Sequence, residues 1–289
     1  MDMKKFLLKL SALALTSAIS LLCIYFVMFS VSVNITGLAS EVFYAIKKAG
    51  QNSGLPAVIL GDSVCNQLWP QKMDTPGLSH LGCNQAITPA GTYLLLKKYL
   101  EHNPQTKEVY YLITPGSLGN DLGLRFTYQY FVIPFLDDEN MKLIDEETRQ
   151  KLYDKFGKFF VENGYVKNFL LNNNLFMEQY INYVRSKTEP SYHHRLSPTA
   201  IRYLPKIRQL CREHNAVLKV LPLPVPDVKG SHGWENFRAD VRANGLDDIL
   251  GDFTQQIIYY PEEWFRDGVH FTKEILSLHL EEIRRAILR

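Results

Sequence analysis

The sequence has almost no excess of charge of either sign. Its 289 residues contain 32 Lys and Arg and 30 Asp and Glu, which gives a formal net charge of +2. The proportions of 46% hydrophobic and 21% charged residues are those of an ordinary globular protein. A basic stripe interleaved with aromatic residues, the usual signature of nucleic-acid binding, is missing from the chain. We therefore expect no nucleic-acid partner.

Cysteine is also scarce, with only four residues: Cys23, Cys65, Cys83 and Cys211. They do not combine with histidine at the spacings of a metal site, so we expect neither a metal nor another cofactor. Cys65 and Cys83 lie close to two successive strand candidates. Two interpretations of this pair stay open: a disulfide formed in an oxidising compartment, or two small buried hydrophobic side chains.

Charge is entirely absent between Leu10 and Ser40. Residues 10–33 of this run are long enough to cross roughly 30 Å of hydrocarbon as a helix. Three lysines precede the run: Lys4, Lys5 and Lys9. A basic flank stays in the cytoplasm, which predicts a single-pass anchor in the plasma (inner) membrane with the rest of the chain on the extracytoplasmic (periplasmic) side.

Residues 1–40 are thus expected to comprise a cytoplasmic basic flank and a transmembrane anchor. A signal peptide cleaved near Ala39 is the alternative, although the apolar core of such peptides usually spans only about 7 to 15 residues. Residues 41–54 then read as a juxtamembrane linker that begins as a helix and ends in a flexible turn.

Short apolar runs alternate with amphipathic segments over residues 55–289. The strand candidates are residues 57–60, 78–83, 109–114 and 217–221, with a fifth near Ile257; the helix candidates begin at Thr88-Pro89, at Ser197-Pro198 and after Thr272. Strands that alternate with helices of this length predict an α/β domain whose parallel sheet is covered on both faces.

Residues 122–196 interrupt this alternation and form a predicted helical insertion. One helical stretch in it places four apolar side chains on a single face: Leu152, Phe156, Phe159 and Phe160. The insertion is interpreted either as a cap packed on the core or as a lid or docking surface beside a functional site, because loops that follow strand ends commonly carry function.

The stretch Gly61-Asp62-Ser63 lies where the first strand candidate turns into a helix. Ligands of parallel sheets bind outside the carboxyl ends of the strands, so Ser63 is a candidate nucleophile. The alternative is that Ser63 only caps the following helix, a position that serine favours.

Asp267 and His270 lie three residues apart in a second stretch, just before the last helix. A tight turn would hold the carboxylate against one imidazole nitrogen and leave the other to take a proton from a serine hydroxyl, as in a Ser-His-acid triad. Such a base is what a serine needs to react at neutral pH. The alternative is a structural histidine that bonds Asp267.

These two motifs, Gly61-Asp62-Ser63 and Asp267-x-x-His270, resemble those of the SGNH (GDSL-type) hydrolase superfamily. The resemblance covers about residues 55–289 in the order of the strands. It implies a flavodoxin-like three-layer α/β/α sandwich and activity as an esterase, a lipase, or an O-acetyl transferase or esterase on carbohydrates. It also implies Ser63 as nucleophile, His270 as general base and Asp267 as orienting acid.

The oxyanion site departs from the superfamily pattern. The family's second block offers a glycine N–H, and the matching region here has Gly82 and Gly91 without a clean match. The third block, Gly-x-Asn-Asp, directly follows the third strand in the family, whereas Asn120-Asp121 lies several residues farther on. The candidate oxyanion donors are therefore the backbone N–H of Ser63 together with Gly82, Asn84, Gly91 and Asn120.

The anchor and the altered middle blocks are similar to membrane-anchored SGNH proteins that act beside membrane-bound O-acyltransferases. In that interpretation Ser63 takes an acyl group, chiefly acetyl, from an acyl donor, and passes it to a glycan or polyol hydroxyl of a cell-surface polymer; in a hydrolase, water resolves the same acyl-enzyme. A third hypothesis is a non-catalytic partner that keeps the fold and supports a membrane-bound O-acyltransferase or a polymer assembly complex.

Overall fold

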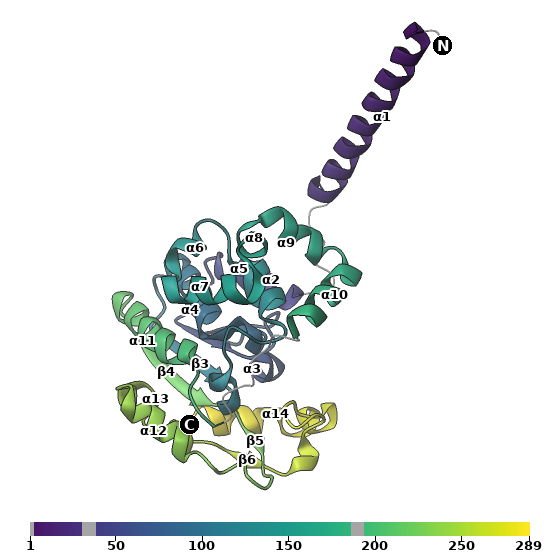
Figure 1. Ribbon diagram of the computed structural model, residues 1–289. Helices are drawn as coiled ribbons and strands as arrows, with labels where there is room; N and C mark the ends of the chain where they lie inside the picture. The colour runs from purple at the N-terminus through teal and green to yellow at the C-terminus, as the bar shows by residue number, and fades with distance from the viewer. Residues whose placement is uncertain (1–2, 31–38, 186–193) are drawn as a thin grey trace.

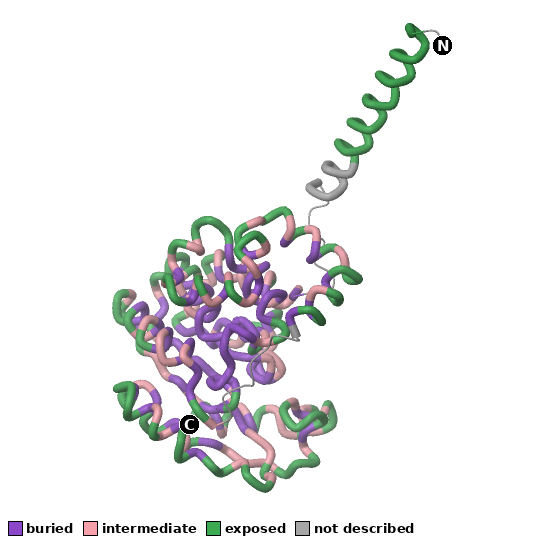
Figure 2. Tube along the Cα trace, viewed as in Figure 1, coloured by how far each residue is buried: buried purple, intermediate pink, exposed green. Residues whose placement is uncertain are grey.

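The computed structural model describes residues 3–30, 39–185 and 194–289 (Figure 1). Helix α1 (Met3–Ser30) projects from a body that contains all the other elements. Its side chains are exposed from residue 3 to residue 23, whereas buried residues concentrate around the sheet of the body (Figure 2). The segment Met3–Cys23 is long and apolar enough to cross a membrane by its length and composition. The expected end of the span, residues 31–33, lies outside the described residues.

A four-stranded parallel sheet forms the centre of the body, in the order β2-β1-β3-β4. The strands are β1 (Ala57–Gly61), β2 (Leu78–Gly82), β3 (Glu108–Ile113) and β4 (Val217–Pro222). Every residue of β1 is buried, as a central strand covered on both faces requires. The α/β class, the parallel pairing and four of the five strand candidates are thereby confirmed.

Helices cover both faces of this sheet. Alternate side chains of β1 enter two separate hydrophobic clusters, Val58 and Leu60 in one and Ile59 in the other, because successive side chains of a strand point to opposite faces. The first cluster also holds apolar side chains of α2 (Ser40–Ala49), α4 (Thr88–His102) and α11 (Pro198–Glu213), and the second those of α3 (Ser63–Leu68) and α14 (Lys273–Ile287).

The helix expected at the start of the juxtamembrane linker, residues 41–54, is α2, and it packs into the core. In α2, the side chains of Val42, Ala45 and Ala49 are fully buried, and the helix contacts both α4 and β2. Small apolar residues on one face allow α2 to lie close to its neighbours. The folded body therefore begins at α2.

The described part of the predicted insertion, residues 122–185 and 194–196, is mostly helical, but Gly157 interrupts the helical stretch expected in it. Its positive φ of 81°, which glycine adopts without strain, ends α7 and starts α8. As a result Phe159 is 62% exposed, whereas Leu152 and Phe156 are buried. The described elements are a π-helical turn η3 (Tyr128–Val132), α5 (Ile133–Phe135), α6 (Asn140–Leu143), α7 (Glu146–Phe156), α8 (Lys158–Glu162), α9 (Gly164–Leu171) and α10 (Asn174–Arg185).

The fifth strand predicted near Ile257 is present as only two residues, and it does not join the main sheet. A two-residue strand, β6 (Tyr259–Tyr260), pairs instead with β5 (Val225–Pro226) in a separate small sheet. Pro226 and Pro261 limit this pairing, since proline has no N–H to donate to a ladder. Helices α12 (Glu235–Ala243) and α13 (Asp247–Leu250) lie between β5 and β6 in the chain.

Candidate active site

Ser63 begins helix α3 at the carboxyl end of the central strand β1. The N-cap of α3 is Asp62, whose Oδ1 accepts hydrogen bonds from the backbone N–H groups of Val64 at 3.1 Å and Cys65 at 3.4 Å. Asp62, and not Ser63, therefore caps the helix. The Ser63 hydroxyl is left available to other partners.

Two glycines allow α3 to lie so close to the ends of the strands. A Cβ added at Gly61 would lie 2.0 Å from the carbonyl oxygen of Leu112 and 2.5 Å from Cβ of Cys65. At Gly82 it would lie 2.7 Å from the backbone nitrogen of Asn66. The glycine of the Gly61-Asp62-Ser63 stretch is thus required by packing at the strand-to-helix turn.

The structure brings Ser63, His270 and Asp267 together although 207 positions separate Ser63 from His270. The Ser63 Oγ lies 2.8 Å from Nε2 of His270. The other imidazole nitrogen, Nδ1, lies 2.9 Å from Oδ2 and 3.2 Å from Oδ1 of Asp267. With the proton on Nδ1 donated to the carboxylate, Nε2 is free to accept the serine proton, which is the arrangement of a Ser-His-acid triad.

Asp267 also shapes the turn that carries the histidine. Its Oδ1 accepts hydrogen bonds from the backbone N–H groups of Val269 at 3.2 Å and His270 at 2.8 Å. Burial raises the pKa of the Asp267 carboxyl, but the hydrogen bonds from the backbone and imidazole of His270 outweigh it and hold the pKa below its ordinary value. The carboxylate is therefore ionised near neutral pH and can stabilise an imidazolium.

Gln67 fixes the histidine segment to the serine helix, and the sequence did not single it out. Its Nε2 donates to the carbonyl oxygen of Phe271 at 2.8 Å, and its Oε1 accepts from the N–H of the same residue at 3.0 Å. Gln67 lies one turn after Ser63 on α3, and Phe271 directly follows His270. This reciprocal pair thus sets the position of the imidazole relative to the hydroxyl.

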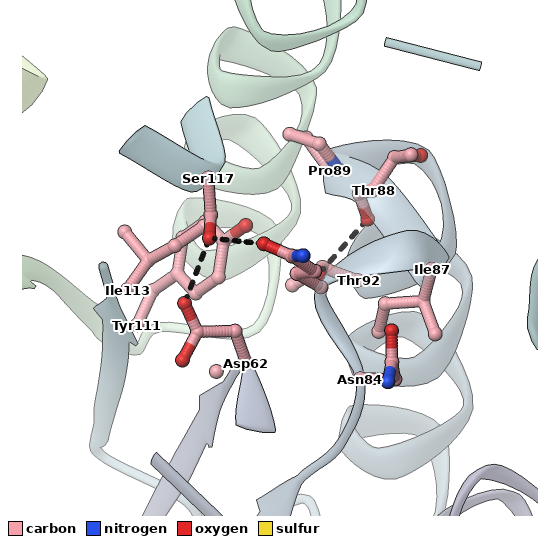
Figure 3. A pocket seen from close by; sticks show the side chains of 11 residues that line it. Asp62, Asn84, Ile87, Thr88, Pro89, Thr92, Tyr111, Ile113 and Ser117 are labelled. Atoms are coloured by element: carbon pink, nitrogen blue, oxygen red, sulfur yellow. Dashed lines mark hydrogen bonds between the residues drawn. The ribbon is translucent and has the colours of Figure 1, made fainter. Parts of the chain in front are cut away.

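A small cavity lies at the ends of β1 and β3, where Gly61 and Ile113 line it (Figure 3). The second carboxylate oxygen of Asp62 accepts from the N–H of Thr114 at 2.8 Å and from the hydroxyl of Ser117 at 3.0 Å. In Figure 3, Asp62 and Ser117 face one another on one side of this cavity, and Asn84 lies on the other. Asp62 therefore joins the turn after β3 to the turn that carries Ser63.

The candidate oxyanion donors fall into two groups. Ser63 and Asn84 lie at the ends of neighbouring strands, because Gly61 pairs with Gly82 and each residue follows its glycine by two positions. The Asn84 Oδ1 accepts from the N–H of Ala86 at 2.9 Å, so its amide nitrogen retains two donor hydrogens.

Three candidates remain: Gly82, Gly91 and Asn120. Gly82 ends β2, and its carbonyl accepts a hydrogen bond from the side chain of Gln71. Gly91 lies inside α4, where a Cβ would come within 2.9 Å of Ile87. Asn120 is buried and donates its amide to Oε1 of Gln85 at 3.0 Å.

Glu41 is another residue of this region that the sequence did not indicate. It lies in the first turn of α2. Burial raises the pKa of the Glu41 carboxyl, opposed by the side chains of Asn84 and His270.

The two cysteines beside the site are free thiols. The side chains of Cys65 and Cys83 are both fully buried, and burial raises the pKa of each well above that of an ordinary thiol. Of the two interpretations left open, the structure supports the second, in which Cys65 and Cys83 are small buried hydrophobic side chains. Within residues 3–30, 39–185 and 194–289, no three His, Cys, Asp or Glu side chains gather as a metal site requires.

No protein-family model and no curated protein matches the chain. A match among solved structures is described as "a putative platelet activating factor from Streptococcus pneumonia". It is 10% identical, covers 94% of this chain and 96% of that chain, and has a TM-score of 0.37. A likeness of that score carries no functional argument, so the geometry of the site is what bears on function.

Proposed function

We propose that the protein is a membrane-anchored, extracytoplasmic serine esterase or O-acyltransferase of the SGNH type, with a flavodoxin-like sandwich as its catalytic domain. The observation that carries the proposal is the continuous hydrogen-bonded relay from Ser63 Oγ through His270 to Asp267. Both motifs lie at the carboxyl edge of the parallel sheet, where ligands of such sheets bind.

The proposed chemistry proceeds through an acyl-serine. The Ser63 Oγ attacks the ester carbonyl while Nε2 of His270 takes its proton, and the ionised Asp267 stabilises the imidazolium that results. Donors near Ser63 bind the oxyanion of the tetrahedral intermediate. The imidazolium then protonates the departing alkoxide, which leaves as an alcohol with the acyl group retained on Ser63.

Resolution of the acyl-enzyme repeats these steps with another oxygen nucleophile. His270 takes a proton from water in an esterase, or from a glycan or polyol hydroxyl in an acyltransferase, and returns it to Ser63. We favour acetyl esters of a cell-surface polysaccharide as substrates, with a membrane-bound O-acyltransferase as a partner. This choice is supported by the apolar N-terminal helix, which would keep the site beside the membrane.

A fluorophosphonate probe tests whether Ser63 is activated. The full chain in detergent or membranes is incubated with the probe beside three variants: Ser63→Ala, His270→Ala and the matched control Ser277→Ala, which removes an exposed serine of α14. Labelling of wild type and control but of neither triad variant is expected. If wild type, shown to be folded, stays unlabelled in its membrane, the enzyme proposal fails and the non-catalytic partner takes its place.

A second assay separates hydrolysis from transfer. The labelled-acetyl ester that the wild type turns over is supplied with a polyol acceptor, and free acetate is measured against acetylated acceptor. A product ratio that rises with acceptor concentration supports transfer, whereas acetate alone supports hydrolysis.

A further inference from the structure

We propose that the exposed face of helices α9 and α10 is a membrane-contacting surface, which lies in the headgroup region of the bilayer that α1 spans. The proposal rests on one part of the proposed function, the membrane anchor, and does not depend on catalysis at Ser63. It assigns a partner of defined chemistry, a phospholipid bilayer, to the helical insertion.

Large apolar side chains are exposed on three consecutive helices of the insertion, α8 to α10. Five of these side chains are at least 40% exposed: Phe159, Tyr165, Leu175, Phe176 and Tyr183. Helix α9 contacts both α8 and α10, so the three helices form one continuous layer. A single exposed apolar residue needs no explanation, but a group of them on adjacent helices marks an interaction site.

Helix α10 keeps its buried and its exposed apolar residues on different faces. The side chains of Met177, Ile181 and Val184 are buried in the main hydrophobic cluster and hold the helix on the body. Phe176 and Tyr183 lie seven positions apart, so they share one face of the helix, and both side chains are exposed. The exposed pair is therefore not needed for the packing of α10.

The surface formed by residues 163–177 exposes no charged side chain. Lys167 is the only charged residue between Glu162 and Glu178. Its side chain is buried, and its Nζ donates to the carbonyl oxygen of Leu136. A surface in contact with water usually carries about a quarter to a third charged residues. A neutral face that contains exposed tyrosine suits instead the membrane interface, where aromatic rings lie at the level of the headgroups.

The position of α1 identifies the bilayer as the partner. Helix α9 contacts α1, and Figure 1 shows α8, α9 and α10 on the side of the body from which α1 projects. The segment Met3–Cys23 of α1 is long and apolar enough to cross a membrane. When α1 crosses the bilayer, this side of the body faces the bilayer. An amphipathic face of this kind enters the boundary between headgroups and acyl chains by about 5 to 10 Å.

Quenching of a fluorescent probe by labelled lipids tests the proposal with the full chain in phosphatidylcholine vesicles. Cys23→Ser removes the exposed thiol, and the other three cysteines are buried. An environment-sensitive probe is then attached through Leu175→Cys. The matched control is Leu278→Cys, at a leucine that is 76% exposed on α14, away from α1 in Figure 1.

We expect phosphatidylcholine that carries a nitroxide to quench the probe at position 175 and not the probe at position 278. A nitroxide near the headgroup should quench more strongly than one at the end of the acyl chain, because the face enters only the interface. The same quenching is expected with Ser63→Ala added, since the surface does not depend on catalysis.

Two results would overturn the proposal, and they differ in what they say of the proposed function. If the chain floats with the vesicles but the probe at position 175 is not quenched, or is quenched no more than the probe at position 278, the surface contacts no lipid and is left to a protein partner. If the chain does not float with the vesicles, the membrane anchor itself has failed.

Discussion

At the scale of single residues, the contact between Ser63 and His270 is supported by a side chain other than Asp267, that of Gln67. Gln67 is the only bridge described here that joins α3 to the backbone directly after His270 through two reciprocal hydrogen bonds. The imidazole is otherwise held by a short turn whose Asp267 is close to half exposed. The serine-histidine contact is therefore set by packing and by the amide of Gln67 together.

Replacing Gln67 tests this dependence. We expect Gln67→Ala to lower kcat by about 10²-fold, since a displacement of about 1 Å in a reacting group costs a factor of that order. The kcat of Gln67→Glu should lie between those of the wild type and Gln67→Ala. A carboxylate still accepts a hydrogen bond from the N–H of Phe271 but cannot donate one to its carbonyl oxygen. The rate of fluorophosphonate labelling measures the effect on Ser63 directly. Labelling of Gln67→Ala at the wild-type rate would contradict the proposed role of Gln67.

The close packing around Gly61 leads to a second prediction, which concerns the stability of the fold. Because a Cβ there would meet the carbonyl oxygen of Leu112 at 2.0 Å and Cys65 at 2.5 Å, backbone must move. We expect Gly61→Ala to lower the free energy of unfolding by at least about 3 kcal/mol, at or beyond the upper end of ordinary overpacking. Urea unfolding measures the loss. Gly164→Ala is the matched control, since nothing lies within 4 Å of a Cβ at that position.

Sequence motifs predict some residues of this candidate site and not others. Ser63, Asp267 and His270 were predicted because a triad needs those residue types at strand ends, and one contiguous turn already joins the last two. Gln67 acts through a contact with a segment 204 positions away. Nothing in the local sequence around Gln67 indicates which segment it will meet.

At the scale of elements, buried strands were the most predictable parts. Apolar runs marked β1, β3 and β4 to within a residue or two, most clearly β1, which is buried throughout as a strand covered on both faces requires. The run near Ile257 is also apolar, but Pro261 closes it and its strand pairs outside the main sheet. The buried face of α2 consists of one valine and two alanines, which is a weak signal beside two adjacent lysines.

The insertion is joined to the core helix α11 by an ionic contact that should depend on pH. Asp145 caps α7 through the N–H of Thr148 at 2.9 Å and pairs with Lys206 of α11 at 2.7 Å. Burial raises the pKa of Asp145, but the hydrogen bonds from Lys206 and Thr148 outweigh it and lower the pKa to about 2. Its ordinary value is 3.8.

Because the folded pKa is depressed, the stabilisation by Asp145 is present above the unfolded pKa and is lost as the pH falls through the folded one. A shift of this size corresponds to about 2 kcal/mol. Asp145→Asn keeps the cap but not the charge, so it should be less stable than wild type by about that amount at pH 7. Urea midpoints should converge as the pH falls from about 5 toward 2. A difference that does not change with pH would exclude the ionic contact as its cause.

At the scale of the whole molecule, the N-terminal helix and the folded body are close in the chain. Ten residues, 31–40, separate Ser30 at the end of α1 from Glu41. A fully extended chain advances at most about 3.6 Å per residue, so Glu41 cannot lie more than about 40 Å from the end of α1. An anchored protein would thus keep its site near the membrane surface, where a surface polymer or a membrane-bound acyl donor is found.

The last prediction concerns where the folded body begins and what α1 does. The full chain should remain with membranes after an alkaline carbonate wash, and its mass should include α1. A chain that begins at Ala39 should be soluble, unfold cooperatively and react with the fluorophosphonate probe, because α2 is complete in it. A chain that begins at Gly50 should not fold, since it lacks the fully buried Val42, Ala45 and Ala49, and burying a valine alone contributes about 1.5 to 3 kcal/mol.

These chains also separate the two interpretations of the N-terminus. An anchor predicts that the intact mass is found in the membrane fraction, whereas a signal peptide predicts a mature mass that begins near Ala39, in the soluble fraction. Cleavage there would leave α2 in place, so the mature chain would keep the arrangement of Ser63, His270 and Asp267. It would lose α1 and would no longer be held at the membrane. Activity in the soluble fraction, from a chain of the mature mass, would therefore contradict the prediction of an uncleaved anchor. It would leave the prediction of a Ser63-His270-Asp267 triad unchanged.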